Sequence, residues 1–227
     1  MRITSFGDAA LLVEYEPVID ASVNAQVLDA SNRVRQAHLP GVRDVVPAYA
    51  SFAVHFDPLR ADITQLRAAI ARAAARSRPE KALGRCLEIP VCYGGRVGPD
   101  LAQVAAWAGC GAHEVVASHA AREYRVFMLG FLPGFPYMGT VEERIAMPRR
   151  ATPRLRVPAG SVGIAGRQTG VYPFDSPGGW QIIGRTPVVL FDPRRDPPAL
   201  LSPGERVRFR AIPPAEFDAI RGGGDAR

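Results

Sequence analysis

The chain has 227 residues, of which 47% are hydrophobic, so it can build one large core or two small ones and is not a disordered protein. No apolar run approaches the roughly 18 residues that cross a bilayer, and no signal peptide pattern opens the sequence, which predicts a cytoplasmic protein without membrane contact. The net charge of +6 comes almost wholly from arginine, but no reading helix, zinc finger or RNA-binding signature accompanies it, so we expect no nucleic acid partner.

Strand and helix patterns alternate through the first 92 residues. The expected elements are strands at 3–6 and 10–15, a helix at 19–37, strands at 42–47 and 51–56, a helix at 63–74 and a strand at 83–91. Asp20 or Ser22 is available to cap the first helix. This order predicts a small α+β sandwich with helices over one face of a sheet. The segment from Ser77 to Glu80 is the best candidate for a domain boundary.

The second half of the chain has two short helical patterns and then mainly β signals. The expected elements are helices at 101–107 and 112–119, strands at 182–183, 188–191 and 207–209 among other short apolar runs after residue 124, and a terminal helix at 215–220. Asp100 can cap the first of these helices. Apolar runs that recur every eight to twelve residues between Gly and Pro turns predict a closed or nearly closed antiparallel β structure.

Residues 127–180 combine dense Gly and Pro with aromatic and β-branched residues. Linkers lack such residues, so this composition predicts rigid, shaped loops on a β scaffold, where a binding site would lie. The segment from Gly160 to Thr169 resembles a phosphate-binding loop, but its spacing differs, and Tyr172-Pro173 forbids the helix that must follow. Its backbone amides remain candidates for an anion-binding nest.

Four polar residues are candidates for chemistry. His119 ends a short helix, where it could project into the loops as a general acid or base, or could cap its own helix terminus. Ser176 lacks the Gly-x-Ser-x-Gly context of a nucleophile and is better interpreted as a hydrogen-bond donor. Gln168 and Thr169 present polar groups within a glycine-rich loop, as specificity contacts often do.

Four arginines, at 149, 150, 154 and 156, cluster in one Pro-punctuated segment. They can bind carboxylates or phosphates in bidentate geometry, or they can form a solvated basic face. The three cysteines show no CxxC pattern and predict neither a disulfide framework nor a zinc site. Cys86 and Cys92 are expected to be buried small hydrophobes.

Several long motifs in a fixed order resemble one family. They are Cys92-Tyr-Gly-Gly95, Tyr124-Arg-Val-Phe-Met-Leu-Gly-Phe-Leu-Pro-Gly-Phe-Pro-Tyr137, Pro148-Arg-Arg-Ala-Thr-Pro-Arg154, Val157-Pro-Ala-Gly-Ser-Val-Gly-Ile-Ala-Gly166, Gln168-Thr-Gly170, Ser176-Pro-Gly-Gly-Trp180 and Gly184-Arg-Thr-Pro187. The family is that of the 5-oxoprolinase B subunit, also described as allophanate hydrolase subunit 1 or the carboxyltransferase C/D subdomain. The Bacillus sporulation-kinase inhibitor KipI is similar too.

This resemblance implies an α+β domain at residues 1–84, followed by a cyclophilin-like antiparallel β barrel at residues 85–227. It also implies ATP-dependent opening of 5-oxo-L-proline to L-glutamate, in which the chain acts with a homologous C subunit and a third subunit and is inactive alone. ATP would be used with those partners, and neither a metal site nor a biotin attachment site is evident in this chain. The alternative implied by KipI is an inhibitor that binds a sensor histidine kinase.

As an enzyme subunit, the chain would combine its candidate residues in one site. The expected residues are His119, Gln168 and Ser176 for catalysis, Gly134, Phe135, Thr169, Gly178, Gly179 and Trp180 for substrate binding, and Arg149 and Arg154 for anion binding. One departure is visible, because Arg167 stands where relatives often carry Gly or Asn. Arg167 adds bulk and charge beside Gln168.

Overall fold

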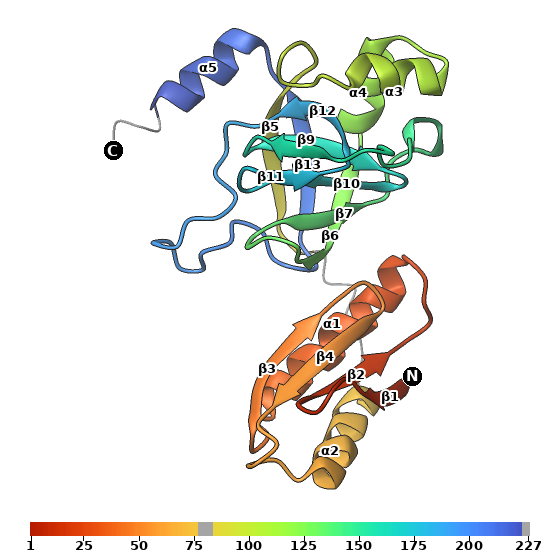
Figure 1. The fold of residues 1–227 in the computed structure, drawn as a ribbon, viewed down its shortest axis with the longest axis vertical. Helices are drawn as coiled ribbons and strands as arrows, with labels where there is room; N and C mark the ends of the chain where they lie inside the picture. The colour runs from red at the N-terminus through yellow and green to blue at the C-terminus, as the bar shows by residue number, and fades with distance from the viewer. Residues whose placement is uncertain (77–83, 224–227) are drawn as a thin grey trace. The chain divides into compact units, whose positions relative to one another are not determined.

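The structure, a computed structural model, describes residues 1–76 and 84–223. Contacts within the chain divide it into two compact units, Met1–Ala82 and Leu83–Arg227 (Figure 1). The sequence predicts the boundary after residue 84, two residues later than the one found from contacts. The candidate boundary segment from Ser77 to Glu80 lies outside the described residues. Within the described ranges no helix is both long and apolar enough to cross a membrane. The cytoplasmic location stays a prediction.

The N-terminal unit contains one four-stranded antiparallel sheet. Its elements are β1 (Arg2–Ser5), β2 (Ala10–Glu14), α1 (Ala21–Gln36), β3 (Val42–Pro47), β4 (Ser51–Phe56) and α2 (Ile63–Ala75). The strand order is β1-β2-β4-β3, so β4 inserts between the two strands that α1 connects. Each neighbouring pair is antiparallel.

Both helices contribute to a single core against the sheet. Phe52, Val54 and Phe56 alternate along β4 and are buried, as their period of two predicts. They share an apolar cluster with Val27 of α1 and Ile70 of α2. One cluster that includes both helices places them over the same face of the sheet, which confirms the predicted α+β arrangement.

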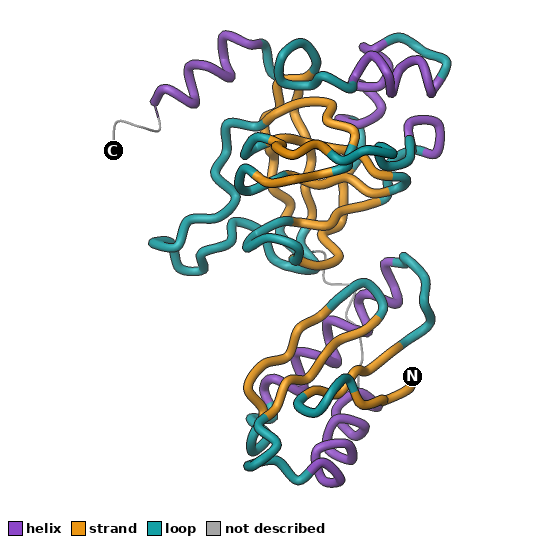
Figure 2. Tube along the Cα trace, viewed as in Figure 1, coloured by secondary structure: helices purple, strands orange, loops and turns teal. Residues whose placement is uncertain are grey.

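The second unit contains a closed barrel with helices outside it (Figure 2). Its elements are β5 (Cys86–Tyr93), α3 (Leu101–Ala108), α4 (Ala112–Ala120), β6 (Glu123–Leu129), β7 (Pro136–Gly139), η1 (Glu143–Ile145), β8 (Arg154–Val157), β9 (Ser161–Ala165), β10 (Gln168–Val171), β11 (Ser176–Gly178), β12 (Gln181–Arg185), β13 (Arg206–Ala211) and α5 (Pro214–Gly223). The closed order is β10-β7-β6-β13-β5-β12-β9, while β8 and β11 form a separate two-stranded sheet.

The predicted fold class, an α+β domain followed by a cyclophilin-like barrel, is confirmed, with one difference in strand direction. The neighbours β5 and β13 run parallel, with Cys86 opposite Arg206 and Val91 opposite Ala211, whereas the other barrel pairs are antiparallel. Parallel neighbours need a long crossover. Here nearly the whole barrel sequence lies between these two strands, so a pattern of short hairpin-like runs does not reveal the pairing.

One predicted strand is wrong. Residues 188–191 form a loop that makes only an isolated bridge, between Phe191 and Ala199. The Val188 N–H is taken by the Thr186 hydroxyl at 3.1 Å, and the Leu200 N–H donates back to the Leu190 carbonyl at 2.8 Å. The backbone of this apolar run therefore makes its hydrogen bonds within its own loop, and the buried Leu190 side chain packs in the hydrophobic core.

Candidate functional site

Aromatic side chains from several loops and strands surround the ring of Phe135. Their ring centroids lie close to that of Phe135: Phe131 at 5.6 Å, Tyr137 at 4.9 Å, Tyr172 at 5.1 Å and Trp180 at 5.4 Å. Most of these pairs are edge-to-face or tilted, the arrangement that aromatic quadrupoles favour. Phe135 is 1% exposed and therefore packs the cluster, so the substrate contact predicted for it has no surface in this structure.

Two of the predicted substrate-binding glycines have a steric reason to be glycine. Gly134 lies in the left-handed region at φ +75°, directly before Phe135. A Cβ on Gly178 would meet the hydroxyl of Tyr172 at 2.4 Å, so only glycine allows that ring to pack. Gly179 is not crowded in this way, and its carbonyl accepts the Arg150 N–H at 2.7 Å. Their contact with substrate stays a prediction.

A buried carboxylate, Asp100, holds two of the clustered arginines. Asp100 Oδ1 accepts from Arg154 at 2.6 Å and from Arg150 at 3.3 Å. Its Oδ2 accepts the Ile182 N–H at 2.6 Å. The side chain makes no cap hydrogen bond to α3, so the predicted capping role is wrong although Asp100 does occupy the N-cap position. Arg154, expected to bind an external anion, is instead paired inside the chain.

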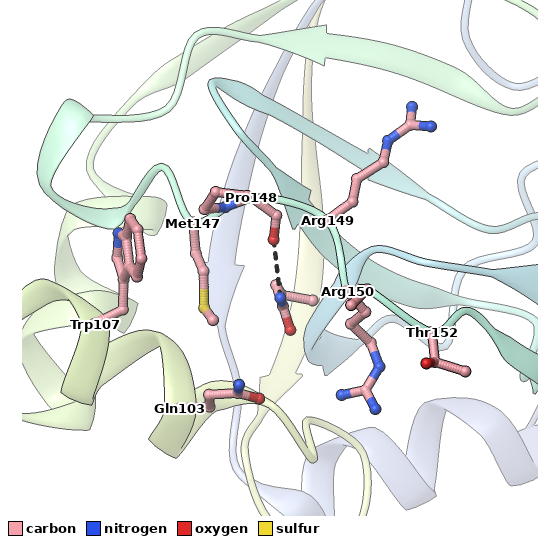
Figure 3. A pocket seen from close by; sticks show the side chains of 9 residues that line it. Gln103, Trp107, Met147, Pro148, Arg149, Arg150 and Thr152 are labelled. Atoms are coloured by element: carbon pink, nitrogen blue, oxygen red, sulfur yellow. Dashed lines mark hydrogen bonds between the residues drawn. The ribbon is translucent and has the colours of Figure 1, made fainter.

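A cavity of about 370 Å³ lies beside these arginines (Figure 3). Its walls include Gln103, Trp107, Met147, Arg149, Arg150 and Gln181. In Figure 3 the Arg149 side chain points away from Gln103 and Trp107. The Arg149 guanidinium instead lies 5.9 Å from the Trp180 ring centroid, in cation–π geometry. Arg150 is the other arginine in the cavity wall.

Sequence reasoning missed Asp100, Gln103, Trp107 and Gln181 as members of this region. Trp107 is 56% exposed on α3, which is unusual for a large aromatic side chain. The only sequence signal was indirect, since a single acid precedes the helix and an arginine cluster follows some fifty residues later. Residue types at that separation do not reveal that they meet.

His119 does not project into the loops as predicted. It is fully buried inside the barrel, where its ring stacks on Phe209 at 4.7 Å. Its Nδ1 lies 2.8 Å from the Tyr93 hydroxyl and its Nε2 lies 2.9 Å from Thr169 Oγ1. The alternative interpretation, a cation capping its own helix, also fails, because both ring nitrogens are engaged inside the barrel.

The hydrogen bonds around His119 determine its tautomer. The Thr169 hydroxyl donates to the Gly163 carbonyl at 3.0 Å, so it accepts from His119 Nε2–H. His119 Nδ1 therefore carries no proton and accepts from Tyr93. Burial lowers the pKa of His119 from 6.5 to about 3, so the ring stays neutral. This geometry gives His119 and Thr169 an internal, stabilising role, and neither side chain reaches the protein surface.

Acidification is expected to destabilise the barrel through His119. Between about pH 6.5 and 3 the unfolded chain protonates this ring and the folded chain does not, so the unfolded state binds more protons. Stability then falls with pH by about 1.4 kcal/mol per unit in that window, or about 2 kcal/mol between pH 6.5 and 5. Urea unfolding of wild type and His119→Gln at pH 7 and 5 measures this.

The same measurement has an internal control in His113, which is exposed on α4. His113→Gln is expected to keep the wild-type pH dependence, whereas His119→Gln loses most of it. An unchanged pH dependence in His119→Gln would show that another group titrates.

Ser176 and Gln168 occupy different surroundings. Ser176 on β11 is 8% exposed, and its hydroxyl has no hydrogen-bond partner among the described residues. A nucleophile must be accessible, and the Ser176 hydroxyl oxygen is buried here. Gln168 opens β10 opposite Ala165 and is half-buried. Because strand side chains alternate, it faces away from the barrel interior that Thr169 occupies. The structure thus separates the three predicted catalytic residues, whose roles remain predictions.

The glycine-rich segment is a hairpin between β9 and β10. Two of its glycine N–H groups are already used: Gly160 donates to the Tyr172 carbonyl at 2.7 Å and Gly166 to the Met147 carbonyl at 2.8 Å. These amides do not form the anion nest that the sequence allows. Arg167 lies at the hairpin turn, largely exposed, with Nη1 3.9 Å from Glu143 Oε2.

Metal-type residues do not converge in the parts of the chain that the structure describes. Across residues 1–76 and 84–223 no group of three His, Cys, Asp or Glu side chains could hold an ion.

Cys92 is buried, as expected, but Cys86 is exposed at the start of β5, which corrects its predicted burial. A strand end leaves that side chain beyond the barrel core.

Comparisons with known proteins place the chain in a family. Residues 1–201 match the model of the carboxyltransferase domain, subdomain C and D. The 5-oxoprolinase B subunit of Bacillus subtilis (strain 168) is 40% identical, covering 97% of this chain and 96% of the relative. The 5-oxoprolinase B subunit of Escherichia coli O157:H7 is 46% identical, covering 92% of this chain and 94% of the relative.

Solved structures agree with this assignment. TTHA0988 is 39% identical with a TM-score of 0.79, and the match covers 89% of this chain but only 40% of that one. The Kluyveromyces lactis urea amidolyase, at 20% identity and a TM-score of 0.81, shares the fold over 98% of this chain and 15% of its own. The chain therefore belongs to the carboxyltransferase subdomain C and D family, with 5-oxoprolinase B subunits among its relatives.

Proposed function

We propose that this chain is the B subunit of a 5-oxoprolinase, an enzyme that opens 5-oxo-L-proline to L-glutamate with ATP. It would act with a homologous C subunit and a third subunit. The observation that carries the proposal is its similarity to relatives named as 5-oxoprolinase B subunits, at 40% and 46% identity over more than nine-tenths of both chains.

The geometry of the barrel supports a subunit that is inactive alone. Amide hydrolysis needs a positioned acid, base or nucleophile that reaches the substrate. The candidates in this chain are enclosed, since His119 is fully buried and Ser176 is 8% exposed. What the surface does offer is positive charge at a cavity, where Arg150 could stabilise an anionic group of the substrate. The reacting groups would then come from partner subunits.

The glycine-rich segment of this chain differs from a phosphate-binding loop. The N–H groups of Gly160 and Gly166 donate to the Tyr172 and Met147 carbonyls, and a strand rather than a helix follows. No step of ATP chemistry is therefore assigned to these residues.

Reconstitution tests the proposal. The chain is purified alone and with its two partner subunits, and loss of 5-oxo-L-proline and formation of L-glutamate are followed with and without ATP. We expect turnover only from the complete set with ATP. A complete set without turnover would reject the proposal, and retention of a sensor histidine kinase by such an inactive chain would favour the KipI-like alternative.

A further inference from the structure

We propose that the cavity beside Arg150 and Gln181 binds a small carboxylated lactam through two contacts, one to its carboxylate and one to its amide N–H. The proposal rests on the proposed function, because 5-oxo-L-proline carries both groups on one five-membered ring. Nothing in the sequence motifs singled out Gln181, and the residues first expected to bind substrate lie in the neighbouring aromatic cluster.

The first contact is to the side-chain oxygen of Gln181. This residue is 2% exposed and lines the cavity. Its Nε2 donates to the Pro148 carbonyl at 2.9 Å (Figure 3). A carbonyl can only accept, so this bond fixes the orientation of the amide. Gln181 Oε1 then has no hydrogen-bond partner among the described residues. A buried oxygen of this kind calls for a donor, and a ligand N–H supplies one.

The second contact is to the guanidinium of Arg150. Its Nη1 donates to Asp100, whereas its buried Nε has no partner among the described residues. The backbone N–H of Arg150 is also anchored, to the Gly179 carbonyl at 2.7 Å. Asp100 thus holds Nη1 and leaves the outer part of the guanidinium, on a side chain that is 32% exposed, for a ligand. A carboxylate pairs with a guanidinium of this kind through charge-assisted hydrogen bonds.

Charge and shape favour an anionic ring of small size. Arg150 and Arg154 share a single carboxylate, Asp100, so this group of three side chains keeps a positive excess. Trp107 and Met147 provide an apolar wall, against which a flat ring can pack. The volume of about 370 Å³ lies at the small end of ligand pockets.

Three ligands built on five-membered rings test the two contacts. 5-Oxo-L-proline has both groups, 5-oxotetrahydrofuran-2-carboxylate replaces the N–H by oxygen, and 2-pyrrolidinone lacks the carboxylate. Ligand-observed NMR titration of the full chain gives the dissociation constant of each. We expect 5-oxo-L-proline to bind about tenfold more tightly than either analogue, the loss that follows when a buried polar group remains unpaired.

Variants then assign each preference to its residue. Gln181→Leu is expected to remove the preference for the lactam 5-oxo-L-proline over the lactone 5-oxotetrahydrofuran-2-carboxylate. Arg150→Gln is expected to remove the preference for 5-oxo-L-proline over 2-pyrrolidinone. Arg156→Gln is the matched control, because that arginine is exposed and pairs with Asp175; it should keep both preferences. Met147→Trp narrows the cavity from its apolar wall and is expected to weaken the binding of all three ligands. If Gln181→Leu does not fold, Met147→Trp still tests whether the ligands bind in this cavity.

Equal binding of lactam and lactone by wild type, or preferences that survive both variants, would overturn the inference. Absence of 5-oxo-L-proline binding to the chain would overturn it as well, and turnover by the complete enzyme would then leave the proposed function standing with the substrate site elsewhere. Conversely, the expected binding pattern without turnover by the complete set would retain this site and reject the proposed function.

Discussion

Asp100→Ala is expected to lower the free energy of unfolding of the barrel by about 3–5 kcal/mol. Removal of this carboxylate leaves Arg150 and Arg154 without their counter-charge and the buried Ile182 N–H without its acceptor. Asp100 is 3% exposed, so water does not readily replace it. Asp100→Asn keeps an acceptor but not the charge and is expected to cost less.

Denaturant unfolding followed by tryptophan fluorescence measures this change in the barrel alone, because both tryptophans, Trp107 and Trp180, belong to the second unit. Asp175→Ala is the matched control: Asp175 also pairs with an arginine, Arg156, but at the surface. Its expected cost is about 1 kcal/mol or less. Equal losses of unfolding free energy in Asp100→Ala and Asp175→Ala would contradict the role of Asp100 as a buried counter-charge for two arginines.

Phe135→Ala is expected to cost about 3–5 kcal/mol of unfolding free energy, the range for deletion of a buried aromatic ring. The ring is 1% exposed and contacts four other aromatic rings, so its removal leaves a cavity that they cannot readily fill. Denaturant unfolding with Trp180 as a nearby probe checks the effect. Phe135→Leu keeps more side-chain volume than Phe135→Ala and is expected to lose less unfolding free energy.

Phe131 is the matched comparison in the same loop. It is 60% exposed and has a φ of +66°, a backbone region that disfavours a bulky residue. Phe131→Gly loses edge contacts but relieves the backbone, so we expect a net change within about 1 kcal/mol. A large loss at Phe131 and a small one at Phe135 would show that the packing of this cluster has been misjudged.

Local patterns in the sequence predicted most helices and strands. The alternation of Phe52, Val54 and Phe56 defined a half-buried strand, and the helical spacing of Leu66 and Ile70 defined the face of α2 that packs on it. The Asp20 cap was also visible, because a cap bonds to residues two and three positions ahead, here at 2.8 and 3.1 Å. These features depend on neighbours within a few residues, which a sequence displays directly.

The family and the barrel were likewise within reach of the sequence, because long motifs recur in order and turn signals separate the strands. The positions and hydrogen-bond partners of individual polar residues could not be predicted from the sequence. His119 and Thr169 meet across 50 positions, and Asp100 reaches the Ile182 N–H across 82. Closure of the barrel turned His119 inward, paired Arg154 internally and placed Gln181 at a cavity. Burial and pairing at such separations are properties of the packed fold, because they depend on which strands become neighbours, and so only the tertiary structure decided them.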